Sequence, residues 1–127
     1  SKRNSIFFSS KNFFVNLGYK ASKTFEDTSQ GSEILVLKKV RSPTIELITP
    51  MNEKSPSYGW LKRIGGGAYH ICFEIKNADL ADGIDYFKSL NFTTISKPTL
   101  SPAFGGASVV FLWGKDGGLI ELLGFMP

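Results

Sequence analysis

The chain has little of several features that mark special classes of protein. It contains a single cysteine, Cys72, among 127 residues, so an internal disulfide is impossible and a reducing cytoplasm is the expected compartment. It has no apolar run near the roughly 20 residues that cross a bilayer, which argues against a membrane protein. The apolar stretch over residues 6–8 is far too short for the core of a signal peptide.

Strongly clustered charge is also lacking. The net charge is +4 and the isoelectric point is near 9.2, but the basic residues are scattered in short groups and single positions. A protein that binds nucleic acid concentrates Lys and Arg on one element, with aromatic residues between them for base stacking. No nucleic-acid partner is therefore expected. The surplus of positive charge is interpreted as a solvated basic surface. A small anionic ligand, such as a phosphate-bearing thioester, is equally compatible with it.

What the chain does contain is typical of a packed globular core. Hydrophobic residues make up 42% of the sequence and aromatic residues 13%, with eleven phenylalanines. A chain of this length buries about two-thirds of its unfolded surface when it folds. One domain over residues 1–127 is the simplest expectation.

A short motif occurs twice, about 75 residues apart, and indicates an internal duplication. The two copies are Ile45-Glu46-Leu47 and Ile120-Glu121-Leu122. Apolar positions upstream match at an offset of about 73 residues, with Phe14, Leu17 and Tyr19 corresponding to Phe87, Leu90 and Phe92. The duplication places a glutamate at the same point of each half, so two related modules can build one shared site.

Apolar periodicity and turn residues predict similar elements in the two halves. The first half, residues 1–50, is expected to form a helix and three strands, at 5–17, 19–25, 34–40 and 44–49. A connector over residues 51–67 contains a short amphipathic helix, 58–64, and a glycine hinge. The second half, residues 68–127, is expected to form a strand, a helix and three more strands, at 69–75, 79–90, 92–96, 107–113 and 119–123. Residues 98–106 are interpreted as a long loop.

Strand alternation puts each glutamate on a face with apolar neighbours. Glu46 shares its face with Ile48, and Glu121 shares its face with Leu119 and Leu123. A carboxylate in such a place needs a cation, a metal ion or hydrogen-bond donors. The alternative is that each glutamate lies near a sheet edge and reaches water or a lysine.

His70, the only histidine, lies on a strand face with Cys72 and Glu74. A lone histidine is more often a partly buried structural side chain than a ligand. If its face also carries Glu46 and Glu121, these three side chains form a site for a divalent ion such as Mn, Co, Ni or Zn, with open positions for substrate.

The second half resembles the vicinal oxygen chelate superfamily, and most closely its methylmalonyl-CoA epimerases. The resemblance rests on the segments Gly65–Ile75, Pro102–Gly106 and Lys115–Leu122, with a looser likeness before them. It implies an α+β fold of paired βαβββ modules around a metal-bearing cleft. The first module of this chain begins at the helix and lacks the opening strand.

The resemblance also implies roles for the candidate residues. His70, Glu121 and Glu46 would be metal ligands, and Glu121 and Glu46 would be the catalytic carboxylates. In that family the metal polarises a carbonyl while a carboxylate moves the proton of the adjacent carbon. The implied activity is that of a metal-dependent epimerase, isomerase or lyase acting on a carbonyl compound or an acyl-CoA.

Two departures from the family pattern keep other functions open. The first-module histidine ligand is absent, and Ser29-Gln30-Gly31 has serine where the epimerases carry a glutamate. A small-molecule binding protein of the bleomycin-resistance type, without metal, is therefore the alternative, and a structural dimer is a third possibility. A homodimer is expected, because a missing strand exposes a sheet edge that a partner chain or the Phe-rich N-terminus would cover.

Overall fold

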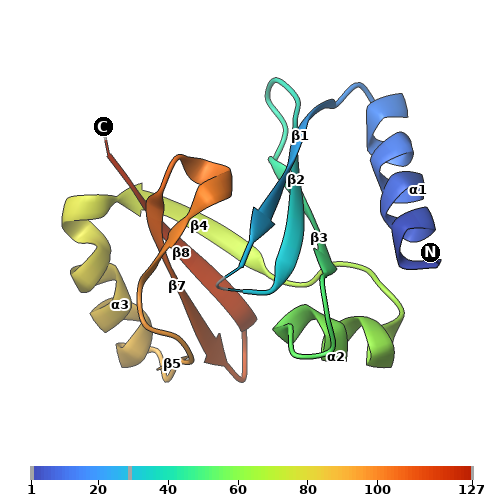
Figure 1. Cartoon of the computed structure of the whole chain (residues 1–127). Helices are drawn as coiled ribbons and strands as arrows, with labels where there is room; N and C mark the ends of the chain where they lie inside the picture. The colour runs from blue at the N-terminus through green and yellow to red at the C-terminus, as the bar shows by residue number, and fades with distance from the viewer. Residues whose placement is uncertain (1, 29, 127) are drawn as a thin grey trace. The chain divides into compact units, whose positions relative to one another are not determined.

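The computed structural model describes residues 2–28 and 30–126, which form two compact units (Figure 1). The first unit ends at Gly66 and the second begins at Gly67. This boundary lies within the glycine triplet at 65–67, where all three residues have positive φ. Gly65 also ends the preceding helix, because its left-handed backbone lets its N–H donate to the Leu61 carbonyl at 2.8 Å.

The first unit consists of a helix, a three-stranded antiparallel sheet and a second helix. Its sheet has the order β1-β2-β3. The elements in chain order are α1 (Lys2–Asn16), β1 (Lys20–Asp27), β2 (Ser32–Lys38), β3 (Ile45–Pro50) and α2 (Pro56–Ile64). Among the described residues β3 pairs only with β2, so its other side has no strand beside it.

Helix α1 packs on one face of this sheet. The buried side chains of Phe7, Leu35 and Leu37 form the centre of the contact, and Phe14, Tyr19, Ile45 and Leu47 pack around them. Burying side chains of this size contributes about 1.5–3 kcal/mol each. The Phe-rich N-terminal segment, which was one of the two candidates to cover an open sheet edge, therefore covers a sheet face.

The second unit contains a mixed sheet of five strands, with α3 on one face. Strand order is β4-β8-β7-β5, and β6 also pairs with β7. Its strands are β4 (Ile71–Lys76), β5 (Thr93–Thr94), β6 (Thr99–Ser101), β7 (Ala107–Gly114) and β8 (Gly118–Phe125), and its helix is α3 (Leu80–Ser89). Strand β4 runs parallel to β8, whereas the other pairs are antiparallel.

Helix α3 covers the face of this sheet on which Leu112 and Leu122 lie. These two side chains are fully buried together with Val110 and Ile120, and Leu80 of the helix joins them. Gly83 allows the helix to approach closely, since a Cβ there would lie 2.8 Å from Cδ1 of Ile75. The chain therefore has an α+β fold in which each unit contains a helix followed by antiparallel strands. The first unit has α2 in addition, and the second has β4 and β6.

The structure corrects three details of the sequence-based prediction. Residues 98–106 are not simply a loop, because they contain β6 and a 3₁₀ turn over Pro102–Phe104. The strand expected over 92–96 is reduced to Thr93–Thr94. The helix expected over 79–90 is α3, Leu80–Ser89, and a 3₁₀ turn over Asn77–Asp79 leads into it without a side-chain capping bond from Asp79.

No helix in the part of the chain that the structure describes is long and apolar enough to cross a membrane.

Candidate functional site

The parallel pairing of β4 with β8 brings His70 and Glu121 together. Cys72 of β4 is the register partner of Glu121, and His70 precedes Cys72 by two residues, so both histidine and glutamate lie on the same side of the sheet. The result is a contact of 3.3 Å between Nε2 of His70 and Oε1 of Glu121. Two of the three residues predicted as ligands are therefore neighbours.

This pair is well shielded from water. The side chain of His70 is 7% exposed and that of Glu121 is 5% exposed. The ring of Phe111, which pairs with Glu121 across β7 and β8, meets the imidazole edge to face at a centroid distance of 5.2 Å. A polar pair in an apolar pocket keeps its electrostatic interactions strong, because little water is present to screen them.

The second ring nitrogen of His70 has no hydrogen-bond partner. Its Nδ1 is buried and unpaired among the described residues, and Nε2 contacts only Glu121. Buried polar atoms are nearly always satisfied in folded proteins, so an unpaired one requires an explanation. An imidazole that is held by one carboxylate and otherwise unsatisfied is more typical of a ligand or catalytic side chain than of a structural one.

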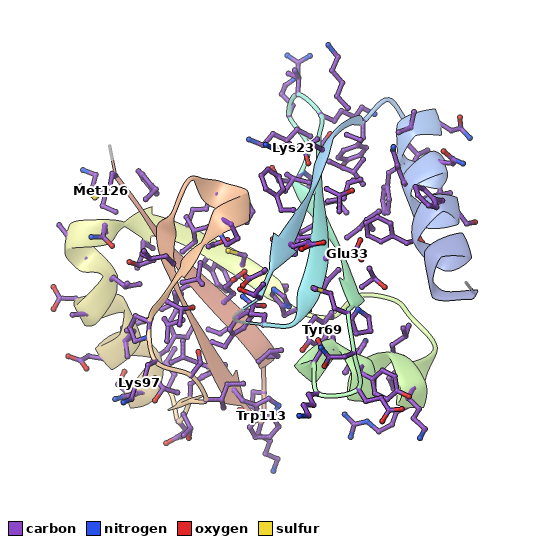
Figure 2. All side chains as sticks on the ribbon, viewed as in Figure 1. Lys23, Glu33, Tyr69, Lys97, Trp113 and Met126 are labelled. Carbon is purple, nitrogen blue, oxygen red and sulfur yellow. The ribbon has the colours of Figure 1, made fainter. Side chains whose placement is uncertain are left out.

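The ring of Tyr69 is a second aromatic neighbour of the imidazole. Its ring centroid is 5.0 Å from that of His70, and Figure 2 labels this tyrosine just ahead of β4. Burial raises the pKa of the Tyr69 phenol above its ordinary value of 10.0. The phenol therefore remains protonated, and able to donate a hydrogen bond, throughout the neutral pH range.

The third predicted ligand, Glu46, belongs to the first unit. It pairs with Val36 across β2 and β3, on the face of the sheet opposite the α1 core, and it is half-buried. This is the same relation to the sheet that Glu121 has in the second unit. Ser29, which stands where the epimerases have a glutamate, lies outside the described residues.

A metal ion fits the two residues that meet, but no complete ligand set is visible. Among the described residues, no group of three or more His, Cys, Asp or Glu side chains is placed to hold a metal. An imidazole nitrogen and a carboxylate oxygen suit Mn, Co, Ni or Zn. Since ligands of one ion typically lie about 3 Å apart when each is about 2.1 Å from the metal, the 3.3 Å separation of Nε2 and Oε1 is compatible with shared coordination.

Sequence reasoning missed two features around these residues. Phe111 was not singled out, although its register with Glu121 would have placed it beside His70 once the strand order was known. A cluster of three buried hydroxyl groups in the first unit, Ser32, Ser55 and Ser57, was also missed, with Oγ separations of 2.8–3.3 Å. Ser32 begins β2, and Ser55 and Ser57 lie at the start of α2, so no sequence pattern would have revealed their contact.

Comparison with known proteins gives matches over most of the chain. The family model described as Glyoxalase/Bleomycin resistance protein/Dioxygenase superfamily matches residues 9–111. The ethylmalonyl-CoA/methylmalonyl-CoA epimerase of Cereibacter sphaeroides is 29% identical over 109 residues, which is 84% of this chain and 79% of that protein. The human mitochondrial methylmalonyl-CoA epimerase is 32% identical over 114 residues, which is 87% of this chain and 62% of that protein.

Comparison with solved structures also gives a methylmalonyl-CoA epimerase. A variant of Streptomyces coelicolor methylmalonyl-CoA epimerase, in complex with 2-nitronate-propionyl-CoA, superposes with a TM-score of 0.77 at 25% identity and covers 93% of this chain and 88% of that one. The α+β fold, with three helices and two sheets, thus matches the fold of these epimerases. The chain belongs to the glyoxalase/bleomycin resistance/dioxygenase superfamily, the vicinal oxygen chelate proteins, and within it resembles the methylmalonyl-CoA epimerases.

Proposed function

We propose that this protein is a metal-dependent epimerase that acts on an acyl-CoA of the methylmalonyl type. His70, Glu121 and Glu46 hold the metal ion in this proposal, and the two glutamates are the carboxylates available for proton transfer. The observation that carries the proposal is the shielded contact between His70 and Glu121, with Nδ1 of the histidine left unpaired. The names of the relatives supply the substrate class.

The reaction needs a base beside an acidic C–H bond. In a methylmalonyl thioester the carbon between the two carbonyl groups loses its proton to a carboxylate, and the electron pair moves onto the thioester oxygen. A proton then returns to the opposite face of that carbon, so only the configuration changes. The chemistry that a bound divalent ion supplies is stabilisation of the negative charge that develops on the oxygen.

The protein's own residues contribute position and a dry environment. The apolar ring of Phe111 and the burial of His70 and Glu121 exclude water, which strengthens every charge interaction at this point. The ring of Tyr69 packs against the imidazole, and burial raises the pKa of its phenol, so the phenol carries no charge in the neutral pH range. Glu46 stands at the matching position of the first unit and supplies the second carboxylate of the duplicated pair.

Metal content is the most direct test. The purified protein is loaded with Co, Ni, Mn or Zn, and bound metal is measured by elemental analysis in the wild type, in His70→Ala and in the control Glu74→Gln, which removes an exposed carboxylate of the same strand. Stoichiometric metal that disappears only in His70→Ala is expected. If none of the four ions binds the wild type, the metal-dependent function is wrong.

Turnover is then followed by proton exchange. Methylmalonyl-CoA is incubated in deuterated water, and the loss of the C–H signal is recorded by NMR with and without chelator. Exchange that needs both metal and Glu121 supports the epimerase. Absence of exchange from a metal-loaded protein would contradict it.

A binding protein without metal is the second candidate. The observation that favours it is that, within the second unit, only two of the predicted ligands meet, and no third His, Cys, Asp or Glu completes the set among the described residues. Such a protein would bind an acyl-CoA equally well in the presence of chelator and would exchange no substrate proton. The two experiments above separate this function from the epimerase.

We further propose that the two units act as one domain and that the chain forms a homodimer, as the open side of β3 suggests. Sedimentation at micromolar concentration tests the homodimer, because a single monomer species would argue against it. Unfolding followed by two spectroscopic probes tests the single domain, because one domain is expected to unfold in one transition that both probes report.

A further inference from the structure

The charge of the chain is distributed unequally between its two units. Residues 1–66 carry eleven of the fifteen basic residues and five of the eleven acidic residues, a formal charge of +6. Residues 67–127 carry the remaining four basic and six acidic residues, a formal charge of −2. The basic surplus therefore belongs entirely to the first unit.

Much of this surplus gathers at one end of the first sheet. We call this group the basic end; it lies where β1 begins, β2 ends and the chain turns toward β3, and it consists of Lys20, Lys23, Lys38, Lys39 and Arg41. All five residues are exposed. Figure 2 shows nitrogen-tipped side chains around this turn, with Lys23 labelled beside it. The acidic residues of the same two strands, Glu26, Asp27 and Glu33, lie at the opposite end.

No described side chain neutralises the basic end by an ion pair. Lys20 and Lys38 are direct register partners across β1 and β2, an arrangement in which like charges repel. Within the described ranges 2–28 and 30–126, none of the five side chains forms an ion pair. A cluster of positive charge with no internal counter-charge attracts an anion with several negative groups.

Two of the lysines are held in place. Nζ of Lys39 donates a hydrogen bond of 2.7 Å to the Leu17 carbonyl and lies 5.9 Å from the centre of the Tyr19 ring. Nζ of Lys23 lies 5.4 Å from the centre of the Phe25 ring. Because Lys23 has already lost part of its freedom, it loses less entropy when a ligand binds, whereas Lys39 is held on the α1 side of the sheet with Tyr19.

The same sheet face carries Glu46. Val36 is the register partner of Glu46, and Lys38 follows Val36 by two residues, so Lys38 and its partner Lys20 point to the side on which Glu46 lies. The Cα of Lys38 is about 7 Å further along the strand than that of Val36. A ligand on this face would place one end at the carboxylate and a second, anionic end at the lysines.

We propose that the basic end binds the phosphate groups of coenzyme A, with Lys20 and Lys38 as the central contacts. The proposal rests on the proposed function, since it assigns the part of the acyl-CoA that lies away from the reacting carbon. An acyl-coenzyme A has two such ends, because an uncharged, flexible pantetheine arm joins its thioester to a pyrophosphate and a 3′-phosphate. Ammonium groups bind phosphate oxygens through short, charge-assisted hydrogen bonds.

Calorimetric titration of the whole protein tests this site. The ligands are coenzyme A, dephospho-coenzyme A, pantetheine and inorganic pyrophosphate, and the double variant Lys20→Gln/Lys38→Gln is compared with the wild type. The matched control is Lys62→Gln/Arg63→Gln, which removes the same charge from exposed positions of α2. Circular dichroism checks that every variant is folded.

The double variant is expected to bind coenzyme A at least about tenfold more weakly, and the control less than about twofold. Binding of pantetheine, which has no phosphate, is expected to be the same in all three proteins. Raising the ionic strength from about 0.05 to 0.5 M should weaken coenzyme A binding in the wild type more than in the double variant.

Several results would overturn the proposal. These are equal loss of affinity in both variants, an effect on pantetheine as large as that on coenzyme A, or lysine-dependent binding of a single-stranded oligonucleotide without binding of coenzyme A. Pyrophosphate binding equal to that of coenzyme A would also overturn it, because it would indicate a site for free phosphates.

The two hypotheses fail in different ways. Lysine-dependent binding of coenzyme A without bound metal or proton exchange would leave this site in place and remove the epimerase. Metal-dependent proton exchange whose KM is the same in the double variant and the wild type would support the epimerase and remove the phosphate site at the basic end.

Discussion

Replacing both His70 and Glu121 by leucine is expected to stabilise the metal-free protein, whereas replacing either one alone is expected to destabilise it. The two side chains are 7% and 5% exposed, and a single contact of 3.3 Å between them satisfies one polar atom of each. Taking polar and charged groups out of water costs free energy that such a pair recovers only in part. Sites kept for function commonly carry this kind of instability.

The magnitudes follow from what each change leaves behind. His70→Leu leaves the buried carboxylate of Glu121 without its partner, which is expected to cost about 3 kcal/mol of unfolding free energy. Glu121→Leu leaves both ring nitrogens of His70 unpaired, because Nδ1 has no partner among the described residues, and is expected to cost about 1–3 kcal/mol. The double variant removes both groups and is expected to gain about 1–4 kcal/mol.

Denaturant unfolding in the presence of chelator measures these differences. The comparison holds if the slope of free energy against denaturant is the same in all four proteins. Adding the metal at a hundred times its dissociation constant should then stabilise the wild type by about 2.7 kcal/mol and leave the double variant unchanged. Two results would refute this reasoning. One is an unfolding free energy of the single variants within about 0.5 kcal/mol of the wild-type value, and the other is a double variant that is less stable than the wild type.

Two further predictions concern packing and pH. Gly114→Ala is expected to cost about 1–3 kcal/mol of unfolding free energy, because the new Cβ would lie 2.7 Å from ring atoms of Phe92. Gly59→Ala, in an open part of α2, is expected to raise the unfolding free energy by up to about 1 kcal/mol. Equal shifts of the two variants in thermal unfolding would contradict this prediction. The phenol of Tyr69 is expected to titrate above pH 10, so its contribution to stability is complete below pH 10 and decreases as the pH rises through its folded pKa. The phenolate absorbance of the wild type minus that of Tyr69→Phe measures this titration, and a midpoint at or below 10 would be inconsistent with a buried phenol.

The sequence predicted the strands that alternate cleanly and the faces on which their side chains lie. His70 and Glu121 could be assigned to matching faces because a period of two residues fixes the side of every side chain. Their contact depended on one more fact, the parallel pairing of β4 with β8, and strands that are about 50 residues apart carry no local signal of that pairing.

The segment over residues 92–106 was predicted less well because its backbone bonds are made partly by side chains. After Thr94, Ile95 still donates its N–H to the Phe111 carbonyl, but the N–H of Phe111 donates to the hydroxyl of Ser96. A side-chain hydroxyl thus takes the place of a backbone carbonyl, and the regular ladder ends there. The prolines and glycines that follow were interpreted as a loop, and β6, a strand of only three residues, is too short for alternation to be recognised.

The duplicated glutamates have unequal surroundings, and this difference bears on the chemistry. Glu121 meets its histidine because β4 runs along β8, and the described residues of the first unit contain no strand that runs parallel to β3 in this way. Glu46 therefore has the right face and register but no parallel strand on the open side of β3. In our proposal, Glu46 is the ligand that the first unit contributes. The histidine contact of the second unit is complete without it, and metal binding by His70 and Glu121 is accordingly the first property to measure.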